Sequence, residues 1–486
     1  MNPSTSQPSS TDCSHQSLLF DKLGSRQVVA DFSGGHVSCN GGLLLLRQVD
    51  CSVGLTRKLS GCFRDHRNPR FVEHGVSELL AQRILPLAAG YEDLNDQQQL
   101  RVDPLLAVAV GKTDPLGEER VCVEDRGKPL AAPCTLNRLE LTNQKPASRY
   151  HKIEADEEAI ADCLLQLGVS TLDKEARELI VDVDLTGILL HGLQQGRHYS
   201  SYYGDYCYTP LLVFVGAVPL WAQLLTADRD ATGAVVPALS KVVVAIRRRC
   251  PSARLIVRGD SEFCREEILA WCEQQRPVVY YCVGMGRNPR LVALLEPALV
   301  RARAMACLTG GVARAFTEFA YQTLETWSRA RRVIGKAEIV QGEDNLRFVV
   351  TSLPPAGFGR KEDGDRFWAQ PLYEQLYCGR GEMENQIKQQ QLDLFGKRLS
   401  THWLGANQLR LWFSAFAQWL VERLRVIGLG GTALATATAG TIRNQLLKVG
   451  AIVTVSVRRV YVQLSSSFLL RDVFVRAQRA LAAASG

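Results

Sequence analysis

Hydrophobic positions recur at intervals of three and four between residues 71 and 110. This spacing predicts helices, and Pro86 is expected to limit the first of them because proline lacks the backbone N–H that continues the helical ladder. Further upstream, apolar and polar residues alternate around Gly34 and Gly35, which predicts a β-hairpin. The N-terminal part of the chain is therefore predicted to be mainly helical, after a polar, disordered arm over residues 1–18.

Short apolar strands dominate the pattern from the middle of the chain. ELIVDVDLTGILL (178–190) is apolar enough for a strand that is buried on at least one face, and residues 210–226 contain two more strands. A helix is expected over 235–250, followed by a strand at 253–257 that ends shortly before Asp260. Strands that alternate with helices in this way predict an α/β core.

The last third of the chain combines three further patterns. Residues 288–370 mix basic, strand-like and turn-rich segments, in which AEIVQGED and NLRFVVTSL predict a hairpin. A helix is predicted to open at Glu384, with its apolar side formed by residues such as Met383 and Ile387. Residues 407–427 predict a strongly amphipathic helix, which precedes a Gly/Ala/Thr-rich linker and a late strand.

Charge and cysteine content narrow the class of protein. The 57 Lys and Arg residues exceed the 50 Asp and Glu residues, which gives a net charge of +7 and favours a polyanionic partner. The 14 cysteines form no zinc-binding spacing, so they are expected to be reduced, as in the cytosol. The N-terminus has neither a signal-peptide pattern nor an apolar span, so no membrane association is expected.

Acidic residues stand out in three separated segments. Asp182 and Asp184 are two positions apart on one strand and so point to the same face, where carboxylates are costly unless a cation meets them. Asp260 follows a later strand, where open α/β sheets place ligands, although it also suits a helix N-cap. The alternative for Glu384 is an ordinary surface ion pair with Lys388, four residues on.

Carboxylates gathered from two strands and a helix suit Mg2+, with Mn2+ as a substitute, because these ions prefer oxygen ligands and leave room for substrate phosphates. Two such ions would activate an attacking oxygen and stabilise the leaving 3' oxygen of a phosphodiester. Whether Asp182 or Asp184 supplies the first ligand stays open. The chain contains no Gly-rich P-loop and no supported Ser/His/Asp or Cys/His arrangement.

Several motifs together resemble one family. VDVDLTG, RGDSEF, YCGRGEMENQIKQQQLDLF and ANQLRLWF resemble insertion-sequence transposases with a DDE catalytic core, especially the insertion sequence 1380-like group. ADFSGGHVSCNGGLLLLRQVD, AAGYEDLND and LRVDPLL extend the resemblance over most of the chain. It implies an α/β fold with a ribonuclease H-like catalytic core, interrupted by a strand-rich insertion and preceded by a mainly helical DNA-binding region.

The resemblance also implies site residues. Asp184, Asp260 and Glu384 match the three catalytic and metal-binding acids. Thr186 completes an Asp-x-Thr motif with Asp184. Asp182 is the candidate auxiliary acid from the strand pattern, because it shares a face with Asp184.

A second signature of such enzymes, Tyr-x2-Arg-x3-Glu-x6-Lys, is matched at Tyr377 and Arg380, which are expected to contact DNA phosphate. At its last position Gln391 replaces lysine. Lys388, one turn earlier on the same helix face, is the residue expected to make that contact instead.

With the resemblance, six segments are expected, in chain order: a disordered arm (1–18), an N-terminal DNA-binding region (19–175), the first part of the catalytic core (176–288), an insertion (289–370), the last part of the core (371–428), and a linker with a C-terminal segment (429–486).

The function that follows from the resemblance is that of a DNA transposase. It would bind the terminal inverted repeats of its element, cleave the strands and transfer the 3' hydroxyl ends to target DNA. Double-stranded DNA is the expected partner, with a homodimer or larger assembly on DNA in a bacterial cytoplasm. The alternatives are a non-catalytic DNA-binding protein derived from a transposase, and a metal-dependent nuclease that hydrolyses without joining.

Overall fold

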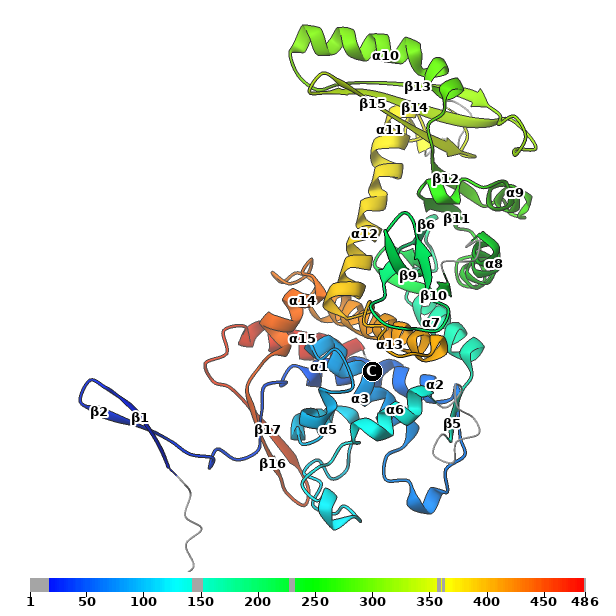
Figure 1. Ribbon diagram of the computed structural model, residues 1–486. Coiled ribbons are helices and arrows are strands. Elements are labelled where there is room, and N and C mark those ends of the chain that lie inside the picture. Colours follow the sequence, from blue (N-terminus) through cyan, green and yellow to red (C-terminus); the bar gives the residue numbers. More distant parts are fainter. Residues whose placement is uncertain (1–16, 142–151, 227–231, 356–359, 361–362, 485–486) are drawn as a thin grey trace, which may run out of the picture.

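One large mixed sheet organises the computed structural model, which describes residues 17–141, 152–226, 232–355, 360 and 363–484. Within these residues the sheet has ten strands, in the order β10-β9-β6-β11-β12-β15-β14-β13, with the short strands β7 (Ile188–Leu189) and β8 (His198–Ser200) added to β9. Helices lie on both sides of its first half (Figure 1). The α/β class expected from the sequence is confirmed.

The first half of the sheet contains the predicted core strands. They are β6 (Glu178–Leu185), β9 (Asp205–Val215), β10 (Val218–Thr226) and β11 (Arg254–Gly259), and β12 (Tyr280–Met285) lies next to β11. β6, β9 and β10 are antiparallel neighbours, whereas β6, β11 and β12 run parallel. The parallel connections need crossover helices, which are α8 (Thr232–Arg249) and α9 (Glu266–Gln274).

The segment predicted as an insertion extends this same sheet. β15 (Glu343–Thr351) pairs antiparallel with β12 and with β14 (Arg331–Val340), and β14 pairs with β13 (Ala313–Tyr321). The hairpin between β14 and β15 is the predicted one. The sequence did not predict the long helix α10 (Pro289–Thr309), which covers these strands at one end of the molecule (Figure 1).

The N-terminal region is helical, as expected. Its helices are α1 (Leu43–Val53), α2 (Leu55–Ser60), α3 (Val76–Ala89), α4 (Gln97–Leu100), α5 (Pro104–Val110), α6 (Pro133–Leu141) and α7 (Glu157–Ser170). The prediction that Pro86 limits the first helix was wrong, because α3 continues through it to Ala89. The helix ends where Gly90 adopts a left-handed φ of 94°.

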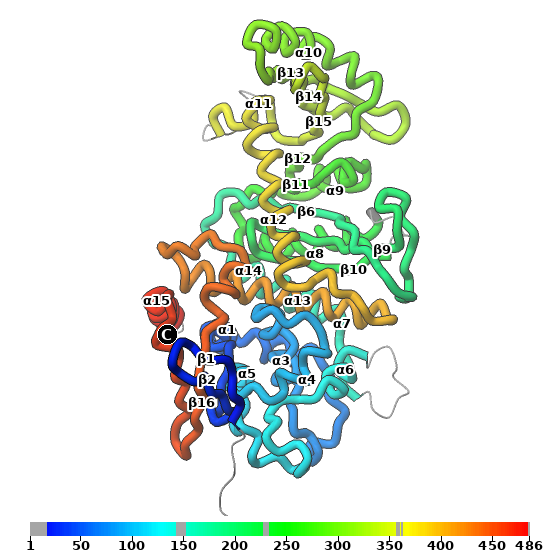
Figure 2. The backbone as a smooth tube through the Cα atoms, turned by 60° about the vertical axis from the view of Figure 1, so that its left-hand side comes forward, coloured from blue at the N-terminus to red at the C-terminus, as the bar shows by residue number. Residues whose placement is uncertain are grey.

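Helix α13 (Leu404–Arg423) lies between the sheet and the N-terminal helices (Figure 2). It packs on β10 and α7 on one side and on α1, α3 and α6 on the other. The prediction of a strongly amphipathic helix was therefore wrong, because α13 is buried on both sides, and its buried residues include the polar Asn407, Gln408, Ser414 and Gln418. Its Gln408 closes the edge of β10, donating from Nε2 to the Ala222 oxygen (3.1 Å) and accepting from the Leu224 N–H (2.5 Å).

The chain after α13 returns to the N-terminal region. It forms α14 (Ala439–Ile442), β16 (Ala451–Val455), β17 (Val460–Leu464) and α15 (Arg471–Ala484), and β16 pairs with β3 (Val37–Ser38). The predicted linker is packed, since its Leu429 and Leu434 are buried. The sequence did not predict α15.

An exposed hairpin extends from the N-terminal side of the molecule (Figure 1). It consists of β1 (Leu18–Leu23) and β2 (Arg26–Ala30), so its turn lies at Gly24, and the prediction of a hairpin around Gly34 and Gly35 was wrong. Most of the predicted arm over 1–18 lies outside the described residues. In the described part of the chain, no helix is long and apolar enough to cross a membrane.

Candidate active site

Two acids lie side by side at the carboxyl ends of parallel strands. Arg258 on β11 pairs in register with Asp182 on β6. Two residues further along the chain come Asp184, still on β6, and Asp260, directly after the end of β11, so the strand register brings these two acids to the same edge. That edge is where parallel strands of α/β sheets present ligand-binding groups.

Asp182 is engaged in an ion pair below this edge. Its two carboxylate oxygens accept hydrogen bonds from Arg258 Nε (2.6 Å) and Nη2 (2.8 Å), and both side chains are buried. Arg258 Nη1 also donates to the Leu376 oxygen (2.6 Å), which ties the pair to the helical segment that carries Glu384. Burial raises the pKa of Asp182, whereas the hydrogen bonds and positive charge of Arg258 oppose this effect, so Arg258 is the cation that balances this carboxylate.

Asp184 has no such permanent neutralisation. Burial raises its pKa to about 7, and the negative charges of Asp260 and, less strongly, Glu384 act in the same direction, whereas Arg380 opposes them. A buried carboxylate crowded by other carboxylates is stabilised in its charged form by a nearby cation. The pKa of Glu262 is also raised, by burial and by Asp260.

The third acid comes from a continuous run of helical turns. α11 (Ala369–Pro371), the π-helical turn Leu372–Tyr377, a 3-10 turn and α12 (Gly381–Lys388) follow one another from the insertion down to α13 (Figure 1). Met383 and Ile387 bury the predicted apolar side of α12, whereas Glu384 is exposed.

Arg380 links the third acid to the first. Its Nη1 lies 3.3 Å from Asp184 Oδ1, and its Nη2 lies 2.7 Å from Glu384 Oε1. The alternative that paired Glu384 with Lys388 was therefore wrong in its partner: the cation is four residues before Glu384, in the preceding turn. Lys388 itself is exposed.

The remaining predicted residues surround the acids. Tyr377 is half-buried; burial raises the pKa of its hydroxyl, Arg380 lowers it and Asp260 raises it. Thr186 accepts a long hydrogen bond (3.5 Å) from Gln391 Nε2, so the residue in the place of the expected lysine lies beside the first strand.

Two residues of the site were missed by the sequence reasoning. Arg258 was visible only as part of RGDSEF, and its buried partner could not be known without the strand register. A Cβ on Gly284 would lie 2.5 Å from the Tyr377 hydroxyl and 3.2 Å from the Asp260 backbone carbon, so this glycine allows β12 and the helical run to meet at the acids.

The model of one protein family, transposase DDE domain group 1, matches residues 20–485. The chain belongs to this family of transposases. Among solved structures it is similar to the piggyBac transposase in a cryo-EM synaptic complex with hairpin DNA, with 10% identity, a TM-score of 0.45, and coverage of 83% of this chain and 79% of that chain. No curated protein matches the chain.

Family membership identifies this transposase as an enzyme that depends on divalent metal. Within the described residues, no three acidic, histidine or cysteine side chains already form a cluster able to hold an ion. The available donors nevertheless suit one: Asp184 and Asp260 offer carboxylate oxygens, and the pKa of Asp184 is raised first by burial and then by the negative charge of Asp260, which a bound cation would offset.

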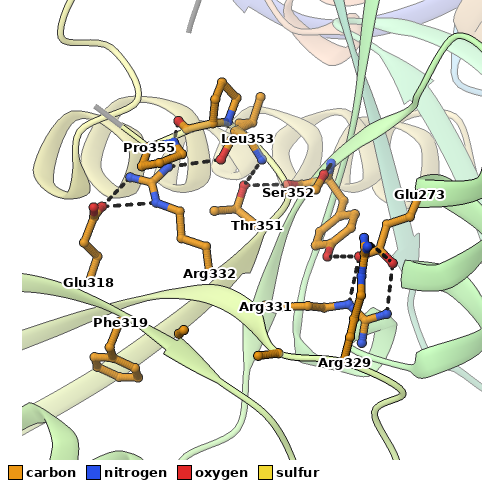
Figure 3. A pocket seen from close by; sticks show the side chains of 14 residues that line it. Glu273, Glu318, Phe319, Arg329, Arg331, Arg332, Thr351, Ser352, Leu353 and Pro355 are labelled. Atoms are coloured by element: carbon orange, nitrogen blue, oxygen red, sulfur yellow. Dashed lines mark hydrogen bonds and ion pairs between the residues drawn. The ribbon is translucent and has the colours of Figure 1, made fainter. Parts of the chain in front are cut away.

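A cavity of about 450 Å³ lies between α9 and strands β13–β15, away from the acids (Figure 3). Its arginines are paired within the protein: Arg331 with Glu273 (2.8 Å) and Glu266 (2.6 Å), and Arg332 with Glu318. This cavity therefore belongs to the ion-pair network that joins the added strands to the core.

Several acidic and basic residues outside this site have structural roles. Asp103 caps α5 by accepting from the Leu105 and Leu106 N–H groups, and Asp93 accepts from the Asn95 N–H. Arg247 and Arg249 donate to backbone carbonyls.

Proposed function

We propose that this transposase cuts DNA at the ends of its element and joins the freed 3' hydroxyls to target DNA, with Asp184, Asp260 and Glu384 as the acids that hold Mg2+. The observation that supports this most directly is the strand register, which puts Asp184 and Asp260 at one edge beside a helix that carries Glu384. The sheet order β10-β9-β6-β11-β12, with β6 parallel to β11, further supports a ribonuclease H-like core.

Each acid has a distinct supporting environment. The buried Asp182–Arg258 pair fixes β6 against β11 and positions the backbone that carries Asp184 and Asp260. Arg380 holds Glu384 toward Asp184 before substrate arrives, and it is the group best placed to meet a phosphate oxygen afterwards. Divalent cations, when bound to these carboxylates, supply activation of the attacking oxygen and stabilisation of the leaving oxygen.

The remaining parts of the proposal concern DNA and assembly. We propose that residues 19–175 contact the terminal inverted repeats, that Tyr377, Arg380 and Lys388 contact phosphates, and that the enzyme works as a homodimer or larger assembly in a bacterial cytoplasm. The net charge of +7 supports a polyanionic partner. Light scattering of the enzyme with end DNA measures the assembly state.

The test uses an oligonucleotide duplex that carries the element's end, assayed for nicking and strand transfer with Mg2+ or Mn2+. Glu384→Gln is expected to bind this duplex normally but to lose both reactions, because one site serves both. Glu382→Gln is the matched control, since Glu382 is exposed two residues away on the same helix.

Three results would redirect the proposal. Normal nicking by Glu384→Gln together with loss in Glu382→Gln would move the third ligand to Glu382. Nicking without joining in the wild-type enzyme would favour the nuclease. Specific binding without nicking in either metal would favour a non-catalytic DNA-binding protein.

A further inference from the structure

The large sheet ends in a strand that has a neighbour on one side only. Within the described residues β13 pairs with β14 alone, so its other side is a free edge of 9 residues, which we call the β13 edge. Helix α10 packs on β13 and β14, and both views place it at the opposite end of the molecule from the N-terminal helices (Figures 1 and 2). A free edge presents backbone N–H and C=O groups that can pair with another strand.

Two arginines show which side of α10 overhangs this edge. Arg301 Nη2 donates to the backbone oxygen of Phe316 on β13 (3.4 Å). A side chain from outside the sheet reaches a strand carbonyl from the free side of the strand, so Arg301 lies on the flank above the β13 edge. Arg303 instead pairs with Asp344 of β15 (2.5 Å), further inside the sheet. It marks the opposite flank of the helix.

The flank above the β13 edge carries exposed apolar side chains. They stand seven residues before Arg301 and four and seven residues after it, a spacing that places them on one face of a helix. These residues are Leu294, Met305 and Leu308, whose surfaces are 45%, 48% and 87% exposed. Single exposed apolar residues are normal, but an apolar row beside an open strand edge is typical of a protein interface.

The charges on β13 are complementary to those of a second, antiparallel β13. Arg314 and Glu318 lie on the same face of the strand, two positions before and after Phe316. If two copies pair about a twofold axis at Phe316, Arg314 of each copy lies opposite Glu318 of the other. Directly opposite residues of antiparallel strands are ~4.5–5.5 Å apart, where opposite charges attract.

Both charged side chains keep hydrogen-bonding capacity for a second copy. Arg314 donates from Nε to Glu338 and from Nη1 to Glu374, which leaves its Nη2 without an acceptor among the described residues. Glu318 accepts both bonds from Arg332 at Oε2, and its Oε1 has no donor in the same part of the chain. The two side chains are 51% and 37% exposed. Pairing between copies therefore breaks no internal ion pair.

The same axis brings the two α10 helices together. Because Arg301 lies beside Phe316, residues equally far before and after Arg301 face each other across the axis, and Leu294 of one copy meets Leu308 of the other. Arg301 has to release the Phe316 oxygen, which then accepts from a backbone N–H of the second copy. Its charge also meets that of its copy near the axis. Arg301 is thus the residue that opposes pairing.

The dimensions of the surface suggest a dimer of modest affinity. The 21 residues of α10 span ~31 Å and the 9 residues of β13 span ~30 Å. With strand and helix layers ~10 Å thick each, the combined face measures roughly 600 Å². Stable interfaces bury ~800 Å² per partner, so this one lies at the weak end of specific interfaces.

We infer that the β13 edge and the adjoining flank of α10 form a homodimer interface, in which the sheets of two copies join edge to edge about a twofold axis at Phe316. This inference rests on the proposed function for the homodimer, and it names the surface that makes it. A twofold axis requires one patch that is complementary to itself, which the Arg314 and Glu318 positions provide. Strands β12, β15 and β14 separate β13 from the strand before Asp260, so the acids stay accessible.

The first experiment measures the dimer Kd of the full-length enzyme by sedimentation velocity without DNA. Arg314→Glu and Glu318→Arg each place like charges opposite one another at two positions, so each is expected to raise the Kd about tenfold. An equimolar mixture of the two variants should dimerise with close to wild-type affinity, because every Glu then faces an Arg. Mixing cannot repair an internal ion pair, so this recovery identifies a contact between copies.

Arg347→Glu is the matched control for this experiment. Arg347 is exposed on the same face of the sheet, two strands from the edge, and its reversal should leave the Kd unchanged. A wild-type enzyme that stays monomeric up to ~100 µM, where even a weak specific interface forms, would overturn the inference. Dimerisation of both single variants with wild-type affinity, or no recovery in the mixture, would also overturn it.

The second experiment tests the α10 flank on its own. Leu308→Asp should raise the dimer Kd without changing the thermal midpoint, because Leu308 is 87% exposed in the single chain. Ala293→Asp, on the outer face of the same helix, is its control. Arg301→Ala should lower the Kd, because it removes the donor that occupies the Phe316 oxygen and the like charge near the axis. Equal effects of Leu308→Asp and Ala293→Asp, or weaker dimerisation of Arg301→Ala, would contradict the proposed geometry.

The outcome is separable from that of the proposed catalytic function. Asp184→Asn should dimerise like the wild type, because Asp184 lies on β6, far from the β13 edge in the strand order. If Asp184→Asn nicks normally while the mixed variants recover the dimer, the catalytic assignment fails and the interface stands. If Asp184→Asn is inactive while Arg314→Glu dimerises like the wild type, the interface fails and the catalytic assignment stands.

Discussion

The two acids on β6 should respond differently to replacement by asparagine. Asp182→Asn should reduce stability but not activity, whereas Asp184→Asn should reduce activity but not stability. Asp182→Asn leaves Arg258 buried at 4% exposure without its carboxylate partner. Removing one member of a buried ion pair typically costs ~3–5 kcal/mol. In larger domains, each kcal/mol of lost stability lowers the thermal midpoint by roughly 2–4 °C, so the midpoint of Asp182→Asn should fall by roughly 6–20 °C.

Asp184→Asn should not reduce the midpoint of the metal-free enzyme. The pKa of Asp184 is raised to about 7, first by burial and then by Asp260, so the folded protein disfavours the charge that the substitution removes. The same substitution takes a carboxylate from the proposed metal site. Loss of a preorganised electrostatic contact at the reacting atoms should reduce nicking by about a thousandfold.

Both quantities can be measured on the same preparations. Differential scanning fluorimetry without metal gives the midpoint, and nicking of an end duplex at a temperature where all variants are folded gives activity per folded molecule. Asp182→Asn should retain most nicking there. A thousandfold loss of nicking by fully folded Asp182→Asn, or normal nicking by Asp184→Asn, would refute the conclusion that Asp182 serves stability and Asp184 serves catalysis.

Three further outcomes are expected. Glu384→Gln should change the unfolding free energy by only a few tenths of a kcal/mol, as for an exposed helical ion pair, while nicking and joining disappear together in a gel assay. Glu140→Gln should lower the midpoint strongly in scanning fluorimetry, since Glu140 is fully buried between Arg83 and Arg410 at 2.8 Å each. Burial alone would raise the pKa of Glu140, but the two arginines lower it, so Glu140 stabilises the fold above its ordinary pKa of 4.5 and this stabilisation is lost as the pH falls through the folded pKa. A midpoint that depends on pH equally in the variant and the wild type would contradict this. Gly284→Ala should displace Tyr377 and slow nicking more than it weakens DNA binding. Single-turnover kinetics measures the nicking rate and an anisotropy titration measures the DNA affinity. Equal losses of nicking rate and of DNA affinity would contradict the packing argument.

Local patterns in the sequence determined much of the framework. The strands β9 and β10 and the burial of Met383 and Ile387 followed from periodicity alone, because side chains alternate along a strand and repeat each turn along a helix. The pattern also placed Asp184 on a core strand, Asp260 just after another strand and Glu384 on a helix, whereas their assignment as metal ligands came from the family resemblance. The family resemblance then supplied the transposase class, which the family match confirms.

Periodicity fails where an element is covered on more than one side or depends on a distant partner. Helix α13 looked amphipathic from its largest side chains, yet two layers enclose it, and the surrounding contacts come from residues hundreds of positions away. The hairpin was expected at Gly34, but Gly24 makes the turn, since the strand pairing that decides between two glycine sites is itself a tertiary contact.

The ion pairs show most clearly what only the tertiary structure decided. The sequence places Asp182 and Asp184 on one face of a strand, and only the Asp-x-Thr motif implied by the resemblance distinguishes them. The parallel register of β6 with β11 brings Arg258 opposite Asp182, while Arg380 reaches Asp184 and Glu384 from a helix nearly two hundred residues later. Charges interact through space, so which acid is neutralised and which stays available is fixed by the packing of strands and helices that are distant in the chain.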